Sequence, residues 1–136
     1  MKTATKISII GILLLFMSFN TISKFDLESK LIGKWSYYSN NNESVAWTKV
    51  EKLDLTKSGL EFKQKGKLIV RMSSGSCGTP PITYKNYKGT WRKTFDSTLI
   101  LTHKFWGGTL ERSILIKALT DKKLIFESVS DKIDRN

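Results

Sequence analysis

The only histidine of the chain, His103, and the arginine Arg112 stand on either side of a Gly107-Gly108 pair. Two adjacent glycines tolerate positive φ and favour a two-residue hairpin turn. Such a turn pairs His103 directly with Arg112 across the two strands that it joins. Both residues alternate with leucines and isoleucines, so a period of two places them on an apolar, inward face. An imidazole beside a guanidinium on such a face is a candidate site for an anionic group.

Arg112 raises the question of a partner, because a buried guanidinium costs several kcal/mol when nothing pairs with it. The pattern places no inward acid on either strand beside it. One solution is a bound carboxylate or other anionic head group, held by Arg112 with His103 beside it and with an apolar tail along the interior. The alternative is that Arg112 stacks on a tryptophan or lies at the mouth of the fold with its head in water. The predicted ligand-binding residues are Arg112, His103, Trp91, Leu101, Phe105, Met72 and Ile114.

The chain carries no recognisable catalytic constellation. Its only cysteine, Cys77, forms with His103 the sole candidate thiol–imidazole pair, and no third orienting residue accompanies them. The "SSGSCG" stretch lacks the spacing of a hydrolase nucleophile elbow, and the carboxylates are scattered. We therefore predict a protein that is not an enzyme and has no metal or cofactor. Cys77 is expected to be a small buried hydrophobe, a free thiol or a link between molecules.

Turn signals divide the chain after Gly33 into short stretches rich in Val, Ile, Thr, Tyr and Trp. Regular spacing of this kind is typical of sandwiches and barrels, and it predicts about eight strands. We expect an all-β fold, an antiparallel up-and-down barrel. The turn signals are Ser39–Ser44, Lys57–Gly59, Lys65–Lys67, Ser73–Pro81, Phe95–Ser97, Gly107–Gly108 and Thr120–Lys123.

Alternation within these stretches predicts which side chains point inward, because neighbours in a strand face opposite ways. The stretch from Trp47 to Leu55 fits no single register, and a bulge near Glu51 would repair it. The inward sets are Leu68, Val70 and Met72; Leu99, Leu101, His103 and Phe105; Leu110, Arg112, Ile114, Ile116 and Ala118; and Leu124, Phe126 and Ser128.

The first residues read as a secretory leader. Lys2 and Lys6 precede an apolar run, Ile7–Phe19, that is short for a bilayer span. A cut after Ser23 would leave a single domain, residues 24–136; an uncleaved anchor is the alternative. Export predicts a periplasmic or secreted protein with no membrane span after cleavage.

A short helix is expected over Phe25–Ile32, with Asp26 as its cap and Gly33 as its end. Removing the two leader lysines lowers the net charge from +11 to +9. Export makes nucleic acid an unsuitable partner, and only Tyr84–Lys88 interleaves aromatic and basic residues. The partners that remain for the positive charge are an anionic ligand or an envelope surface. Alternatively the charge serves only solubility, since the lysines are spread along the chain.

Two Gly-x-Trp motifs, Gly33-Lys34-Trp35 and Gly89-Thr90-Trp91, each open a predicted strand. The first, after its short helix, resembles the opening signature of the lipocalins. The second, in the run "GTWRKTFDSTLILTHKFWGG", resembles the small lipocalin-like proteins of bacterial envelopes, and the likeness covers about Leu31 to Ser130. The resemblance implies a calycin-type barrel that carries a ligand. It also implies a late-strand basic residue packed on the first Trp, for which Arg112 and Lys117 are the candidates.

Two functions follow from these expectations. The first is an exported lipocalin-like barrel that binds a small hydrophobic or amphipathic ligand, for which Arg112 suggests an anionic group. The alternative is an envelope interaction or inhibitor-like module whose barrel is filled by side chains and holds no ligand. A cavity of a few hundred Å³ or more would favour the carrier, and a packed interior would favour the module. Trp106, beside the glycine pair, adds an aromatic tip that is either the lip of a pocket or a partner surface.

Overall fold

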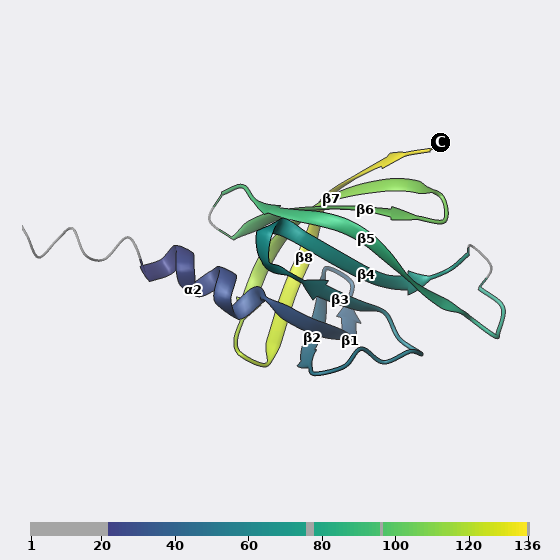
Figure 1. Cartoon of the computed structure of the whole chain (residues 1–136), viewed down its shortest axis with the longest axis horizontal. Helices are drawn as coiled ribbons and strands as arrows, with labels where there is room; N and C mark the ends of the chain where they lie inside the picture. Colours follow the sequence, from purple (N-terminus) through teal and green to yellow (C-terminus); the bar gives the residue numbers. More distant parts are fainter. Residues whose placement is uncertain (1–21, 76–77, 96, 136) are drawn as a thin grey trace, which may run out of the picture.

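The computed structural model describes residues 22–75, 78–95 and 97–135, so most of the predicted leader and Cys77 lie outside it. Helix α2 (Ile22–Leu31) leads into eight strands that form a closed barrel (Figure 1). All the strand pairs are antiparallel, which confirms the predicted all-β up-and-down barrel behind a short helix. The elements are β1 (Gly33–Asn41), β2 (Ser44–Val50), β3 (Gly59–Phe62), the 3-10 turn η1 (Gln64–Gly66), β4 (Lys67–Ser73), β5 (Tyr84–Lys93), β6 (Thr98–Phe105), β7 (Gly108–Leu119) and β8 (Lys123–Asp134).

One connection departs from a simple meander. Strands β3 to β8 follow one another around the barrel, but the β1–β2 hairpin is placed with β2 beside β8 and β1 beside β3. The chain from β2 to β3 therefore has to pass β1. This connection is held on the outside of the barrel by Arg71, which donates to the Leu55 carbonyl at 2.9 Å and to Asn86 Oδ1 at 2.8 Å. The bulge expected near Glu51 is absent from this described segment, because β2 ends at Val50 and the chain leaves the sheet there.

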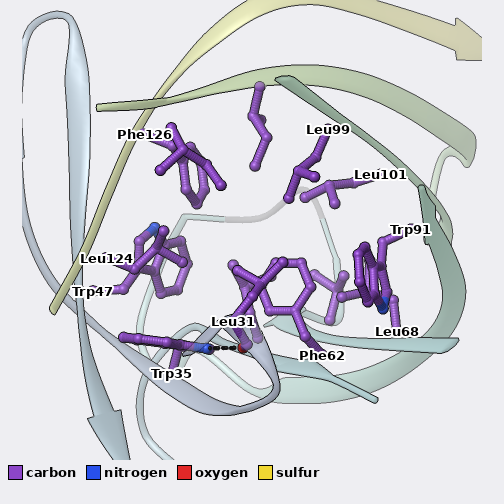
Figure 2. Close-up of a cluster of buried hydrophobic side chains, with 14 residues drawn as sticks. Leu31, Trp35, Trp47, Phe62, Leu68, Trp91, Leu99, Leu101, Leu124 and Phe126 are labelled. Atoms are coloured by element: carbon purple, nitrogen blue, oxygen red, sulfur yellow. Dashed lines mark hydrogen bonds between the residues drawn. The ribbon is translucent and has the colours of Figure 1, made fainter. Parts of the chain in front are cut away.

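Large apolar side chains point into the barrel and are buried there. Each of the eight strands contributes at least one buried apolar residue, and Figure 2 shows these side chains converging from all around the wall. Aromatic rings supply much of the volume, and Trp47 stacks on Phe126 with ring centroids 5.8 Å apart. The fully buried large side chains are Trp35, Phe62, Leu31, Leu68, Leu99, Ile114 and Leu124.

Two bulges between β7 and β8 correct the predicted inward sets. Ile116 pairs with Phe126 but Ala118 pairs with Ile125, so the register shifts between them. As a result Leu119, rather than Ala118, packs against the core. A second shift lies between Ser113 and Ile114; Ser128 pairs with the buried Ile114 and so shares the predicted inward face, although it is exposed. The other members of the four sets share the inward face as predicted.

Helix α2 ends where it meets the barrel (Figure 1). Its last residue, Leu31, is fully buried, and Leu27 packs against the same core. Gly33 has φ +136, a value that suits glycine and ends the helix. Asp26 is not the cap that the sequence predicted, because it lies within the helix and its carboxylate binds Lys30 Nζ at 3.0 Å.

Candidate binding site at the open end of the barrel

The first Gly-x-Trp motif joins the helix to the barrel. Trp35 is fully buried and its indole Nε1 donates to the Leu31 carbonyl at 2.8 Å. Lys49 of β2 passes over Gly33, where a Cβ would lie 2.7 Å from its Cε, and its amine sits 5.1 Å from the Trp35 ring. The same amine donates to the Lys30 carbonyl at 2.9 Å. The cation therefore binds the end of the helix and the face of the indole together.

Lys49 takes the place for which the lipocalin likeness suggested a late-strand residue. Neither candidate from the sequence lies there. Lys117 is at the β7 bulge and pairs with Glu127 at 3.4 Å, and Arg112 binds Asp131. The packing of a cation on the first tryptophan is thus present, but an early strand supplies it.

The second Gly-x-Trp motif has a different neighbour. Gly89 of β5 faces His103 of β6, and a Cβ at Gly89 would lie against the Thr102 carbonyl and 2.7 Å from His103 Cβ. Trp91 Nε1 donates to the Lys63 carbonyl at 2.9 Å, and its ring meets Phe62 edge-on at 5.8 Å. The glycine lets β5 and β6 approach closely, and the tryptophan fixes the turn before β4 to the core.

His103 and Arg112 share the inward face, but they are not direct partners. The β6–β7 turn is centred one residue earlier than predicted, so Phe105 pairs with Gly108. His103 consequently pairs with Leu110, and Arg112 pairs with Leu101. The two polar residues are diagonal neighbours, which lie farther apart than directly opposed residues. Gly108, which pairs with Phe105 at the end of this turn, has φ +134. Glycine adopts this value readily, so the turn requires a glycine at this position.

The prediction that Arg112 has no inward acid beside it is wrong. Its guanidinium binds Asp131 of β8 through two hydrogen bonds, Nε to Oδ1 at 2.7 Å and Nη2 to Oδ2 at 2.6 Å. Ser128 Oγ also donates to Asp131 Oδ1, at 2.9 Å. The hydrogen bond from Arg112 is the main cause that lowers the pKa of Asp131. The pair is partly exposed, and we call the part of the barrel formed by His103, Arg112 and Asp131 the open end. Because Asp131 pairs with it, Arg112 is neutralised without a bound anion.

His103 is a buried neighbour of this pair. The residue is only 7% exposed, and burial is the main cause that lowers its pKa, with a further contribution from the charge of Arg112. Its Nδ1 donates to the Lys104 carbonyl at 2.9 Å, which leaves Nε2 as the acceptor of the neutral ring. The imidazole is therefore better suited to packing than to binding an anion, which would require a protonated ring.

The remaining predicted ligand residues do not line one space. Trp91, Leu101 and Ile114 belong to the packed core, and Met72 lies against it in a partly buried position. Phe105 is elsewhere, at the β6–β7 tip, where its ring meets Trp106 edge-on at 5.4 Å. The sequence identified inward positions correctly but did not separate the core from the rim.

Two residues were missed, one beside Arg112 and one in the core. Asp131 was missed because β8 was read only as far as Val129, whereas β7 is long enough to pair with β8 up to Asp134. Trp47 was not placed in the core, although it is only 8% exposed and its Nε1 has no hydrogen-bond partner among the described residues. Its alternation with Val45 is the signal that predicts this inward position.

A cleft of about 430 Å³ lies at the β6–β7 tip. The tip carries two aromatic rings and two cationic side chains. The residues that line the cleft are Lys104, Phe105, Trp106, Gly107, Gly108 and Arg135.

Comparisons with protein-family models, with curated proteins and with solved structures found no match. Among the described residues, no group of three or more His, Cys, Asp or Glu side chains is arranged to hold a metal ion. Within the same ranges, no helix combines the length and apolar character needed to cross a bilayer. The closed barrel is compatible with ligand binding.

Proposed function

We propose that the protein is an exported envelope module that works through its exterior, with the barrel as a rigid scaffold. The observation that carries this proposal is that buried aromatic and aliphatic side chains from all eight strands converge inside the barrel (Figure 2). A small barrel of eight strands has an interior that side chains can fill. The positive start and apolar run of the predicted leader support export. The likeness of the Gly-x-Trp motifs to those of lipocalins is part of the proposal.

The polar groups of the open end support the same function. An anionic ligand was inferred because Arg112 lacked a partner, and Asp131 now supplies one through two hydrogen bonds. A ligand carboxylate would have to displace that carboxylate and leave it unpaired beside a buried His103. The geometry thus favours a structural ion pair over a receptor for a head group.

A titration with 1-anilinonaphthalene-8-sulfonate, an anionic amphipathic probe, tests this function. We expect no saturable binding of one probe per chain in the micromolar range, because the interior has side chains where the probe would lie. The Leu101→Ala variant is a matched comparison, since it removes a buried side chain from the wall beside Arg112. Saturable binding by the unmodified protein that is stronger than that of the variant, and that depends on Arg112, would support a carrier instead.

A second candidate function is the binding of a small ligand whose acceptor group reaches the indole of Trp47. The buried Trp47 Nε1 favours it, because an unpaired indole N–H inside a protein is costly. Its ring lies between Phe126 and the partly exposed Tyr37, whose centroid is 5.9 Å away. The Trp47→Phe variant keeps the ring and removes the donor. If this function holds, the variant loses a ligand that the unmodified protein retains through purification.

A further inference from the structure

We infer that the tip of the β6–β7 hairpin docks the protein on an anionic lipid surface, with Trp106 entering the interface. This inference rests on the proposed function, because it names the external partner of a barrel that encloses no ligand. The hairpin projects at the end of the barrel away from α2, and the end of β8 runs beside it (Figure 1). The tip is therefore free of the elements that close the other end.

The aromatic residues of the tip are held in place rather than loosely displayed. Trp106 is 50% exposed and meets Phe105 edge-on at 5.4 Å. Phe105 in turn fills the space above Gly107, where a Cβ would lie 2.5 Å from its Cε2. The positive φ of Gly108 fixes the turn. A tryptophan with one side packed and the other exposed is the kind of residue that favours membrane–water interfaces.

Two cationic side chains and a further apolar residue, Ile133, complement the aromatic pair of Phe105 and Trp106. Lys104 and Arg135 line the cleft on either side of the tip, and cations beside an apolar tip favour anionic lipid head groups. Ile133 of β8 is 49% exposed on the adjoining strand. Asp134 also lies at the tip, next to Gly108, and offsets one of the two cations. The general positive charge of the chain adds attraction over a longer range.

The other three tryptophans make the proposal measurable. Trp35, Trp47 and Trp91 are at most 8% exposed, so Trp106 is the tryptophan that solvent or lipid reaches directly. Contact with a bilayer moves its fluorescence to shorter wavelength and exposes it to quenchers placed in the acyl chains. The buried indoles contribute a constant background.

The experiment is a titration of the protein with vesicles made of equal parts phosphatidylglycerol and phosphatidylcholine, followed by co-sedimentation and by quenching with brominated chains. We expect the membrane partition coefficient of a Trp106→Ala variant to be lower by at least about tenfold. The variant lacks the exposed half of the indole, so this apolar area no longer moves from water into the lipid. We expect vesicles of phosphatidylcholine alone to bind much more weakly, and a Lys104→Ala, Arg135→Ala double variant to lose about tenfold on the anionic vesicles.

Phe95 provides the matched control. It is 82% exposed in the turn before β6, at the opposite end of that strand from Trp106. The Phe95→Ala variant should bind vesicles like the unmodified protein. Equal binding by the Trp106→Ala variant, or quenching that is absent in the unmodified protein, overturns the inference. That result leaves the proposed external function standing, whereas a lipid molecule extracted from the barrel interior would overturn the proposed function itself.

Discussion

Replacing Trp91 by alanine tests whether the barrel interior is packed. The ring is 7% exposed, meets Phe62 edge-on at 5.8 Å, and donates to the Lys63 carbonyl at 2.9 Å. Removing a buried tryptophan side chain costs about 3–5 kcal/mol of unfolding free energy. The lost indole hydrogen bond accounts for about 1 kcal/mol of this, and the lost ring pair for about 1 kcal/mol. We therefore expect a loss of about 4 kcal/mol.

Urea unfolding followed by circular dichroism measures this loss. With a slope of about 2 kcal/mol per molar urea, the midpoint should fall by about 2 M. Trp106→Ala makes the same chemical change at a half-exposed site and should change stability by less than about 0.5 kcal/mol. Trp91→Phe, which keeps a ring, is the milder variant if the alanine protein is too unstable to study. A loss below about 1 kcal/mol in Trp91→Ala would show that the ring borders unfilled space, contrary to a packed interior.

Four further predictions concern local contacts and pH. Gly89→Ala should lower stability by about 1–3 kcal/mol because its Cβ meets backbone of the next strand, whereas Gly75→Ala, with nothing within 4 Å, should leave the urea midpoint unchanged. Lys49→Met should cost about 1–2 kcal/mol and loosen the helix, because its amine holds the carbonyl that ends α2; unchanged amide exchange in the helix would contradict this. The folded pKa of His103 is lowered, so its contribution to stability is complete above the unfolded value near 6.5 and is lost as pH falls below it; His103→Asn should flatten that part of the stability profile. The pKa of Asp131 is also lowered, so its contribution is lost only as pH falls below about 3.8, and Asp131→Asn should flatten the acid part alone.

The sequence predicted the class of fold because turn residues and period-two alternation act locally. Every predicted turn signal lies at or beside a strand end, and the inward faces follow from the pleat. The register of the β6–β7 hairpin was wrong by two residues because a Gly-Gly pair allows more than one turn. The β7 bulge at Lys117, which turns Leu119 inward, depends on how two strands fit together and has no local signal.

The candidate site was harder to predict than the fold. Arg112 and His103 were placed on the correct face, but the partner of Arg112 comes from β8, nineteen residues along the chain. The acid was missed because the end of β8 carries few apolar residues and did not read as a strand. The sequence pattern also could not predict that β2 lies beside β8, because this arrangement follows from the path of the β2–β3 connection past β1.

The central claim is that the barrel is occupied by its own side chains and works through its outer surface. Native mass spectrometry of the protein purified from the cells that produce it tests this most directly. We predict a mass that corresponds to the polypeptide alone under gentle ionisation. A retained species of a few hundred daltons, released on denaturation and absent from Trp47→Phe or Arg112→Ala protein, would contradict the claim.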